Sequence, residues 1–426
     1  MAQDGKIIDY MTLHADFAAL HHSDDISKLI LSRNKWPGID MDLVVNSIES
    51  RRKLQNRVSQ WYSEPRMIFP LKLSAEQCSS SATATYKAEL AKQICGTQTW
   101  KIVDLTGGLG VDTWHFSKHA SEVLYNEMQQ TLCEAAEYNF SILGCDNITV
   151  SNNIADCSSV PDILESFKPD IVYLDPARRG DGGKKVFLIE ECTPDILTLK
   201  ECIFKTCRHI LVKLSPMADI NMVCSRLGRT CREVHIVAAE GECKELLVWM
   251  DREWDDDYAI TALEIAKDGT YEPFVFLSSE EKSATAGLYP HMADADSREL
   301  YLFEPGKALM KAGAFNLIGV RFDIRKLGRS THYYIAEDKQ TMERLLRFGK
   351  IFRILRNLPL DKRSIKAAGK DFPKAEVTAR NIPMTSDELR KKTGVTSGDD
   401  AHIFGLKSDT DGNILLCTKR VFKKDL

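Results

Sequence analysis

Residues 102–112 read I-V-D-L-T-G-G-L-G-V-D, and the rest of the chain is arranged around them. A short apolar run ends at Asp104, a glycine-rich turn follows, and an amphipathic run continues over Val111–His119. This succession predicts a strand, a tight connection and a helix. Glycine lets a ligand come close to main-chain N–H groups, and such turns bind nucleotides at the carboxyl ends of parallel strands. The glycines of the turn are Gly107, Gly108 and Gly110.

The spacing of these glycines narrows the class of ligand. The dinucleotide fingerprint G-x-G-x-x-G is not met, because counting from Gly108 puts Thr113 where the third glycine is required. We therefore expect a smaller adenosine-containing ligand rather than a dinucleotide. A tight turn that binds nothing is the alternative.

Apolar runs alternate with helical patterns from residue 101 to about residue 266. This alternation predicts βαβ units, a parallel sheet and the α/β class. The last two of seven strands are joined by the short turn Ala239–Lys244, which predicts an antiparallel pair that closes the sheet. The expected strands are Lys101–Leu105, Glu122–Asn126, Ile148–Ser151, Ile171–Leu174, Ile210–Leu214, Val234–Ala238 and Leu246–Met250.

Helical patterns precede this sheet and mixed patterns follow it. Residues 9–63 are helical in pattern and predict a small N-terminal helical domain. Beyond the strand-like run 258–266, the patterns predict helices at 306–313, 344–356 and 385–393 and strands at 318–323, 375–380 and 414–420. The expected domains are 1–70 (helical), 71–278 (α/β with seven strands), 279–325 (a small segment) and 326–426 (a basic α+β domain).

Composition excludes several classes of protein. Of 426 residues, 43% are hydrophobic and 28% are charged, as in globular proteins. No apolar run reaches the ~18 residues of a membrane span, and the first ten residues do not resemble a secretory signal. We therefore expect a cytoplasmic protein without a membrane partner, whose twelve cysteines, none in a C-x-x-C pair, are reduced. The histidines show no metal-ligand spacing, so no structural metal is expected.

The charge is unevenly distributed along the chain. Residues 339–426 hold 20 Lys and Arg against 11 Asp and Glu, although the whole chain has a net charge of −4. A basic region on an acidic body predicts a module that faces a polyanion, and a solvated basic face is the alternative. Basic residues recur every three residues in the expected helix 344–356 and would share one face of it. They are Arg344, Arg347, Lys350, Arg353 and Arg356.

Four acidic residues follow successive strands of the expected sheet. Asp104 and Asp175 end the first and fourth strands, Glu127 ends the second, and Asp156 follows the third after a short loop. A carboxylate near the end of the second strand accepts hydrogen bonds from the ribose of a bound nucleoside. Four acids at successive carboxyl ends therefore favour a ligand site over unrelated exposed acids.

These motifs resemble those of class I S-adenosylmethionine-dependent methyltransferases. The resemblance rests on D-L-T-G-G-L-G-V-D, on Glu127 and Asp156, and on D-P-A-R at 175–178. The stretches E-Q-C-S-S-S-A-T-A-T-Y-K, D-P-A-R-R-G and K-L-S-P-M further resemble a bacterial group of RNA methyltransferases with a C-terminal THUMP-like domain. Y-L-F-E-P-G-K-A-L-M-K-A-G-A-F and A-R-N-I-P-M-T-S-D-E-L-R-K-K are similar to the ferredoxin-like and THUMP-like parts of that group. The resemblance covers residues 70–426.

The resemblance implies a Rossmann-like catalytic domain and S-adenosylmethionine as cofactor. It implies that the glycine turn surrounds the methionine portion, that Glu127 binds the ribose, and that Asp156 lies near the adenine amine. A Ser/Thr cluster at 79–85 is expected to cap the following helix, and its hydroxyls could also line the site. The cofactor-binding residues expected are Thr83, Asp104, Thr106, Gly107, Gly108, Gly110, Asp112, Glu127, Asp156 and Asp175.

By the same resemblance Asp175 and Pro176 lie where the methyl acceptor meets the cofactor. Enzymes with D-P-P-Y at this turn hold an exocyclic amine, and an aromatic residue stacks on the base. Here Arg178 replaces that aromatic residue, which puts methylation of an amine in doubt. An arginine plane can stack on a base or bind phosphate. We therefore expect Asp175, Pro176 and Arg178 to be catalytic, and Arg179, Arg347 and Arg353 to bind substrate.

D-P-A-R is also similar to the D-P-P-R of uridine-C5 methyltransferases, which need a nucleophilic cysteine after the fifth strand. Here that loop reads L-S-P-M, without cysteine, and Cys192 lies after the fourth strand instead, where a structural role is favoured. Covalent C5 chemistry is therefore disfavoured. The function expected is methylation of tRNA or rRNA. Methylation of a protein or small molecule, and RNA binding without catalysis, are the alternatives. The sequence does not indicate the oligomeric state.

Overall fold

The structure is a computed structural model that describes residues 2–178, 189–292, 299–398, 401–422 and 425. The chain forms two compact units, one of residues 1–234 and 245–256, the other of residues 235–244 and 257–426. Among the described residues, no helix combines the length and the apolar character that crossing a bilayer requires.

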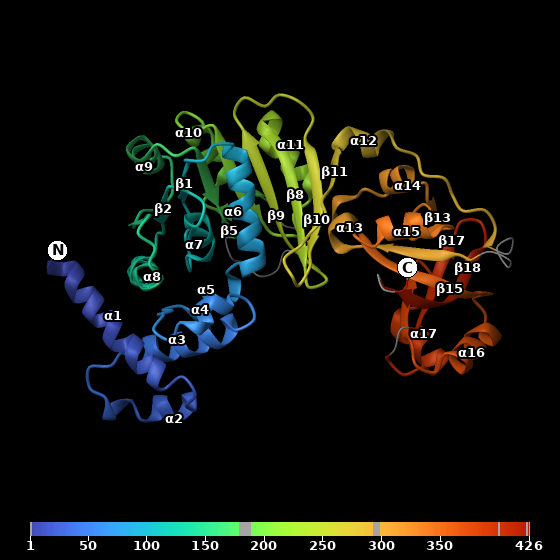
Figure 1. The fold of residues 1–426 in the computed structure, drawn as a ribbon, viewed down its shortest axis with the longest axis horizontal. Helices are drawn as coiled ribbons and strands as arrows, with labels where there is room; N and C mark the ends of the chain where they lie inside the picture. Colours follow the sequence, from blue (N-terminus) through green and yellow to red (C-terminus); the bar gives the residue numbers. More distant parts are fainter. Residues whose placement is uncertain (1, 179–188, 293–298, 399–400, 423–424, 426) are drawn as a thin grey trace. The chain divides into compact units, whose positions relative to one another are not determined.

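The first unit begins with helices that pack on the α/β region. Asp25 and Asp40 cap α2 and α3 by accepting hydrogen bonds from main-chain N–H groups in the first turn. The buried amide of Asn139 accepts a hydrogen bond from the N–H of Ile68 (2.9 Å) and donates one to its carbonyl oxygen (2.8 Å). This pair of bonds fastens the segment before residue 70 to a helix of the α/β region. The helices are α1 (Ala2–Leu20), α2 (Ile26–Leu31), α3 (Met41–Leu54), α4 (Ser59–Ser63) and α5 (Lys72–Gln77), drawn in blue in Figure 1.

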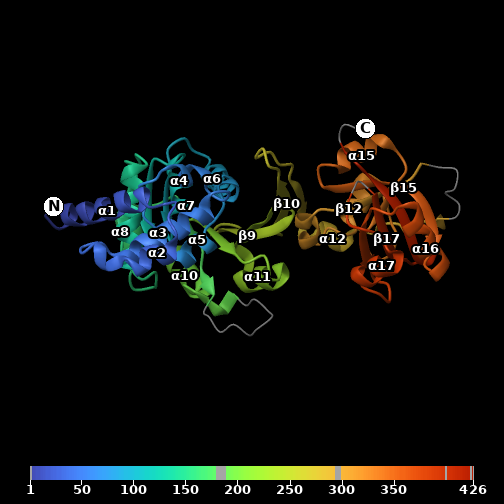
Figure 2. The ribbon, with the colours of Figure 1, turned by 90° about the horizontal axis from the view of Figure 1, so that it is seen from below.

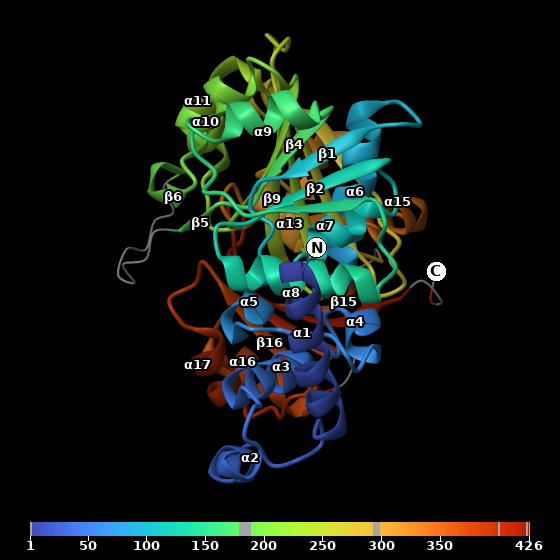
Figure 3. The same ribbon diagram turned by 90° about the vertical axis from the view of Figure 1, so that its left-hand side faces the viewer.

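A sheet follows, in which the strands that belong to this unit stand in the order β9-β7-β4-β1-β2-β3. Strands β3, β2, β1, β4 and β7 pair in parallel, and β9 pairs antiparallel with β7. Figure 3 shows β1, β2 and β4 running side by side. The strands of this unit are β1 (Lys101–Asp104), β2 (Glu122–Asn126), β3 (Ile148–Ser151), β4 (Ile171–Leu174), β7 (His209–Leu214) and β9 (Glu242–Asp251). Residues of the second unit form β10 (Ala259–Ile265), β11 (Phe274–Leu277) and most of β8 (Cys231–Ala239).

The expectation of a parallel α/β sheet is therefore confirmed, and each of the seven expected strands is present. The strand-like run at 258–266 is β10, and β11 was not predicted. A short two-stranded sheet, β5 (Ala177–Arg178) with β6 (Cys192–Thr193), follows β4. The helices of this region are α6 (Ser81–Cys95), α7 (Val111–Ser117), α8 (Gln130–Ile142), α9 (Val160–Phe167), α10 (Ile196–Ile203) and α11 (Ile220–Leu227).

The second unit contains a separate seven-stranded sheet in the order β13-β14-β12-β15-β18-β17-β16. Helices α16 and α17 lie side by side (Figures 1 and 2) and bury Ile365 and Leu389 in one apolar cluster with Val377 of the sheet. The strands are β12 (Tyr301–Pro305), β13 (Arg325–Lys326), β14 (Tyr334–Ala336), β15 (Gly349–Pro359), β16 (Glu376–Arg380), β17 (Ala401–Ser408) and β18 (Gly412–Val421). The helices are α12 (Ser278–Ser283), α13 (Lys307–Ala312), α14 (Leu317–Phe322), α15 (Lys339–Leu345), α16 (Lys362–Asp371) and α17 (Ser386–Thr393).

Two predictions for this unit are wrong. The expected basic helix 344–356 is instead the end of α15 followed by β15, and the expected strand 318–323 is the helix α14. Basic residues at every third position obscured the β-branched and aromatic residues of β15. Such residues favour a strand, and β15 pairs with β12 on one side and with β18 on the other. Because side chains alternate along a strand, Lys350 and Arg353 point to opposite faces of the sheet. By contrast, the predicted helix 385–393 is present as α17, with Thr385 and Glu388 forming its capping box.

Candidate active site

The glycine turn is packed tightly on its inner side and open on its outer side. A Cβ atom added to Gly107 would lie 2.2 Å from the ring of Tyr125, and one added to Gly110, whose φ is +90°, would lie 2.8 Å from Phe140. At Gly108 the nearest atom to such a Cβ would be the Thr106 carbonyl oxygen, at 3.8 Å. The turn therefore requires glycine for its packing, and the space beside Gly108 can admit a ligand.

Asp104 lies beneath this turn and holds it in place. Its carboxylate accepts hydrogen bonds from the Thr106 N–H (3.0 Å) and from the Thr113 hydroxyl (2.7 Å). Burial raises the pKa of Asp104 to about 7, although the two hydrogen bonds oppose that shift. The bonds of Asp104 therefore connect the turn to the start of α7.

Glu127 follows β2 and faces the outer side of the turn. One of its carboxylate oxygens accepts a hydrogen bond from the Gly108 N–H and the other from the Gln129 N–H, each at 3.0 Å. A buried carboxylate held between the glycine turn and the start of α8 is fixed in position. It is the acceptor that ribose hydroxyls require in nucleoside sites of this kind.

Asp175 lies at the end of β4 and is connected to the glycine turn. Its N–H donates to the Thr106 hydroxyl oxygen at 2.6 Å. Its carboxylate lies 2.6 Å from the ammonium nitrogen of Lys213, which projects from β7. The side chain of Asp175 is 37% exposed and that of Lys213 is 13% exposed, so this ion pair faces an opening.

A buried polar network extends inward from Lys213. The Ser79 hydroxyl accepts hydrogen bonds from Lys213 (3.4 Å) and Lys87 (2.9 Å) and donates one to Asp112 (2.9 Å). The fully buried Lys87 also donates to both carboxylate oxygens of Glu245, at 2.8 and 2.9 Å. The network therefore runs without a break from Glu245 to Asp175.

Asp112 remains ionised within this network. Burial alone would raise its pKa, but the ammonium groups of Lys87 and Lys213, with hydrogen bonds from Tyr173 and Ser79, outweigh burial and lower the pKa below its ordinary value. Asp112 was expected to bind the cofactor. Its carboxylate contacts Ser79, Tyr173 (2.8 Å) and Lys87 (3.3 Å).

The roles of Lys87, Lys213 and Glu245 were not predicted from the sequence. Lys213 interrupts the apolar strand H-I-L-V-K-L, and Glu245 precedes the apolar run of β9. A charged residue inside a buried strand is a recognisable pattern, because such residues are rarely buried without a partner. The partners themselves lie too far away in the sequence to be identified: 158 residues separate Lys87 from Glu245.

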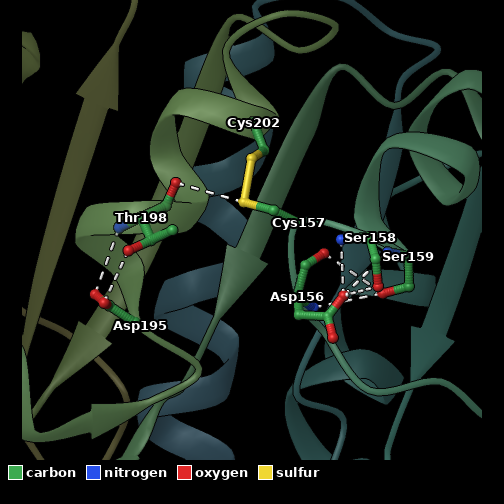
Figure 4. The surroundings of a disulfide bond; sticks show 7 residues. All are labelled: Asp156, Cys157, Ser158, Ser159, Asp195, Thr198 and Cys202. Carbon is green, nitrogen blue, oxygen red and sulfur yellow. Dashed lines mark hydrogen bonds between the residues drawn. A yellow bond between two sulfur atoms is a disulfide. The ribbon is translucent and has the colours of Figure 1, made fainter.

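Asp156 occupies an exposed turn after β3. Its carboxylate accepts hydrogen bonds from the Ser158 N–H and hydroxyl and from the Ser159 N–H. Figure 4 shows this turn beside a disulfide between Cys157 and Cys202. The prediction that every cysteine is reduced is therefore wrong for this pair. Spacing could not reveal it, because the fold brings α10 beside the segment before α9 and places the two Cα atoms 6.0 Å apart.

The remaining expected residues of the first unit lie around Asp175 and at the start of α6. Thr83 is buried in the first turn of α6, where its N–H donates to the hydroxyl of the N-cap residue Ser80 (3.3 Å) and its own hydroxyl donates to the Ser80 carbonyl oxygen (3.2 Å). Pro176 is buried directly after Asp175. The backbone of Arg178 pairs with Cys192 in the β5–β6 ladder. Arg179 lies outside the described residues.

The expected substrate-binding arginines of the second unit are exposed. Arg347 lies between α15 and β15 and forms an ion pair with Glu272 at 2.9 Å. Arg353 lies in β15, with Glu299 at 3.7 Å. Across the described residues no group of three or more His, Cys, Asp or Glu side chains could hold a metal ion.

Comparison with known proteins identifies relatives of both units. Family models match residues 301–342, as a ferredoxin-like domain, and residues 349–420, as a THUMP-like domain. The crystal structure of a presumed methyltransferase from Porphyromonas gingivalis W83 matches with a TM-score of 0.85 and 30% identity, over 97% of this chain and 98% of that one.

A curated relative is the tRNA/tmRNA (uracil-C(5))-methyltransferase of Saccharophagus degradans. It is 32% identical over 116 residues, which cover 22% of this chain and 32% of that enzyme. This chain therefore spans about a third of the length of the curated relative.

Proposed function

The chain belongs to the class I S-adenosylmethionine-dependent methyltransferases that carry a C-terminal THUMP-like domain, and on that premise we propose that it transfers a methyl group to RNA in the cytoplasm. The observation that carries the proposal is Glu127, fixed to the Gly108 N–H beside an open glycine turn. Its geometry suits the ribose of a nucleoside cofactor. The neighbouring Asp175 is held by Thr106 and faces an opening, as an acceptor site requires.

The residues present fit S-adenosylmethionine. Glu127 would accept hydrogen bonds from the ribose, the turn Gly107–Gly110 would border the methionine portion, and Asp156 would lie towards adenine. When bound, the cofactor supplies an electrophilic methyl group on a sulfonium centre. Asp104 and Asp112 support the site through Thr113, Tyr173 and Ser79, and we extend the same supporting role to Thr83.

The reaction requires the acceptor to be aligned with that methyl group. Asp175 and Pro176 would hold the acceptor, and Arg178 and Arg179 would contact the substrate around it. Alignment within a fixed site can supply much of the acceleration of a transfer reaction. The domain assignment 1–70, 71–278, 279–325 and 326–426 is part of this proposal, with the last domain holding the RNA.

The proposal is tested first by cofactor binding. Calorimetry of the full chain should show binding of S-adenosylmethionine or S-adenosylhomocysteine and none of NAD. Absence of heat with either adenosine ligand would contradict the assignment as a methyltransferase.

Catalysis is tested next. With total RNA from a strain that lacks this protein, the chain should transfer labelled methyl groups to RNA. Asp175→Ala should abolish the transfer and leave cofactor affinity within a few-fold, because Asp175 faces the acceptor. Equal losses of affinity and rate would assign Asp175 to the cofactor, and label appearing only in protein or in a small molecule would contradict the RNA substrate.

A further inference from the structure

The polar network of the first unit has a closed end and an open end. At the closed end Lys87 is fully buried and directed at Glu245, Ser79 and Asp112. At the open end Lys213 and Asp175 form an ion pair at 2.6 Å that is partly exposed. An ammonium group has three N–H donors, and within the described residues those of Lys213 contact Asp175 and Ser79. The open end can therefore offer both a donor and an acceptor to an incoming group.

Lys213 keeps its positive charge in this position. Burial would lower its pKa, but the carboxylates of Asp175, Asp112 and Glu245 outweigh burial and raise it above the ordinary value for lysine. Lys213 is therefore a hydrogen-bond donor and not a base at neutral pH. Of the two partners at the open end, the carboxylate of Asp175 is the one that can receive a proton.

The chemistry of the acceptor atom decides which group fits between them. An exocyclic amine has a single lone pair, which it must direct at the methyl group, so it has nothing left to accept from Lys213 and becomes positive beside an ammonium. A ring nitrogen meets the same conflict. A hydroxyl oxygen has two lone pairs and one proton. It can attack with one pair, accept a hydrogen bond from Lys213 with the other, and donate its proton to Asp175.

We propose that the acceptor is a hydroxyl oxygen, the ribose 2′-hydroxyl of RNA, bound between Asp175 and Lys213; this deepens, and rests on, the proposed RNA methyltransferase function. Every ribonucleotide carries this group, and it distinguishes RNA from DNA. As the oxygen–carbon bond forms, the electrons of the methyl–sulfur bond stay on sulfur. The electrons of the O–H bond stay on oxygen, and the proton passes to the Asp175 carboxylate and then to water.

The position of the methyl group tests the proposal directly. Total RNA from a strain that lacks this protein is incubated with the full chain and cofactor labelled in the methyl group, and is then hydrolysed with alkali. Alkali cleaves RNA through a free 2′-hydroxyl, so a 2′-O-methyl group leaves a resistant dinucleotide. We expect the label in dinucleotides.

Label in mononucleotides alone would overturn the hydroxyl assignment and keep the RNA methyltransferase function. Absence of label from RNA, with the chain binding S-adenosylhomocysteine, would overturn both. These outcomes use the unaltered chain, so they do not depend on whether a variant folds.

Lys213→Met tests the role of the ammonium. We expect kcat to fall by about 10²–10⁴-fold, with S-adenosylhomocysteine affinity unchanged within about twofold by calorimetry, and Lys213→Arg to recover part of the rate. The matched control is Lys101→Met, which removes another strand lysine with a single carboxylate partner, Glu122. A normal rate for folded Lys213→Met, or an equal loss in the control, would overturn the assigned role.

Discussion

Two lysines of the first unit have more polar partners than the two arginines of the second unit that are expected to bind substrate. Lys87 is fully buried and Lys213 partly buried among carboxylates and a shared hydroxyl, whereas Arg347 and Arg353 in the second unit are exposed, each with one ion pair. Buried charges are fixed in position by their partners, and removing one partner strongly destabilises the folded state. Exposed pairs contribute little to stability and leave the charge available to a ligand. The same type of charge is therefore held in a fixed geometry by Lys87 and Lys213 and left available to a ligand by Arg347 and Arg353.

Removing Lys87 is expected to have the largest effect on stability. Lys87→Met leaves the carboxylate of Glu245 buried without its cation, and we expect the free energy of unfolding to fall by about 3–5 kcal/mol, measured by urea denaturation. The double variant Lys87→Met/Glu245→Met should recover a large part of this loss, because no unpaired charge remains.

Lys72→Met is the matched control, because Lys72 pairs with Glu49 at 2.8 Å with both side chains partly exposed. We expect a change within about 0.5 kcal/mol. Equal losses in the Lys72 and Lys87 variants would show that burial does not distinguish the two lysines.

A second test concerns Asp104, which is buried without a cationic partner among its hydrogen bonds. Its pKa is about 7 in the folded chain, against an ordinary value of 3.8. Between these values the folded state holds one more proton than the unfolded state. The ionisation of Asp104 therefore lowers the free energy of unfolding as pH rises, by up to about 1.4 kcal/mol per pH unit. The full destabilisation by the buried carboxylate is present above pH 7.

Asp104→Asn should remove the part of the pH dependence of stability that Asp104 causes. Thermal or urea unfolding between pH 4 and 8 should show a shallower loss of stability with rising pH in the variant than in the parent. Parallel pH profiles for the two proteins would contradict the raised pKa of Asp104.

A third test concerns Glu127, whose expected partner is a ligand. Glu127→Ala should weaken binding of S-adenosylhomocysteine by roughly 1–3 kcal/mol, the scale of removing a charged hydrogen-bond partner. Glu134→Ala is the control. Glu134 lies in α8, shortly after Glu127, and among the described hydrogen bonds its carboxylate accepts only from Gln130. Calorimetry in which the two variants bind alike would remove Glu127 from the cofactor site.

The smallest effect on stability is expected at the exposed arginines. Replacing Arg347, Arg353 and Arg356 together with glutamine should leave the free energy of unfolding nearly unchanged. If they contact phosphates, the slope of log affinity against log salt should become shallower by about 0.7 for each lost contact with single-stranded RNA. An RNA affinity and salt slope equal to those of the parent would show that these charges are only solvated.

The parts of the fold that sequence predicts are those governed by local pattern. The strands β1 to β4 and the glycine turn were identified because apolar runs, glycines and terminal acids follow one another within a few residues. The capping box of α17 lies within four residues and was also recognised. By contrast, β15 was mistaken for a helix because its basic residues hid a strand whose pairing partners lie far away in the chain.

In the candidate site, too, the residues predicted from the sequence are those that belong to a local pattern. The acids at the strand ends were recognised individually, and Glu127 and Asp175 both lie beside the glycine turn, bonded to Gly108 and Thr106. The roles of Lys87 and Lys213 were not predicted, because they depend on Glu245 and Asp175, which the fold brings beside them. The disulfide Cys157–Cys202 was missed for the same reason.

The two hydrogen bonds between Asn139 and Ile68 have a consequence for the order in which the chain matures during synthesis. Buried main-chain groups must be paired, and those of Ile68 are paired by a side chain 71 residues further along the chain. A ribosome that has translated only the first helices has therefore not yet made the residue that completes their packing. The helices α1 to α4 are synthesised before α8, but they can reach their final state only after α8 has emerged from the ribosome.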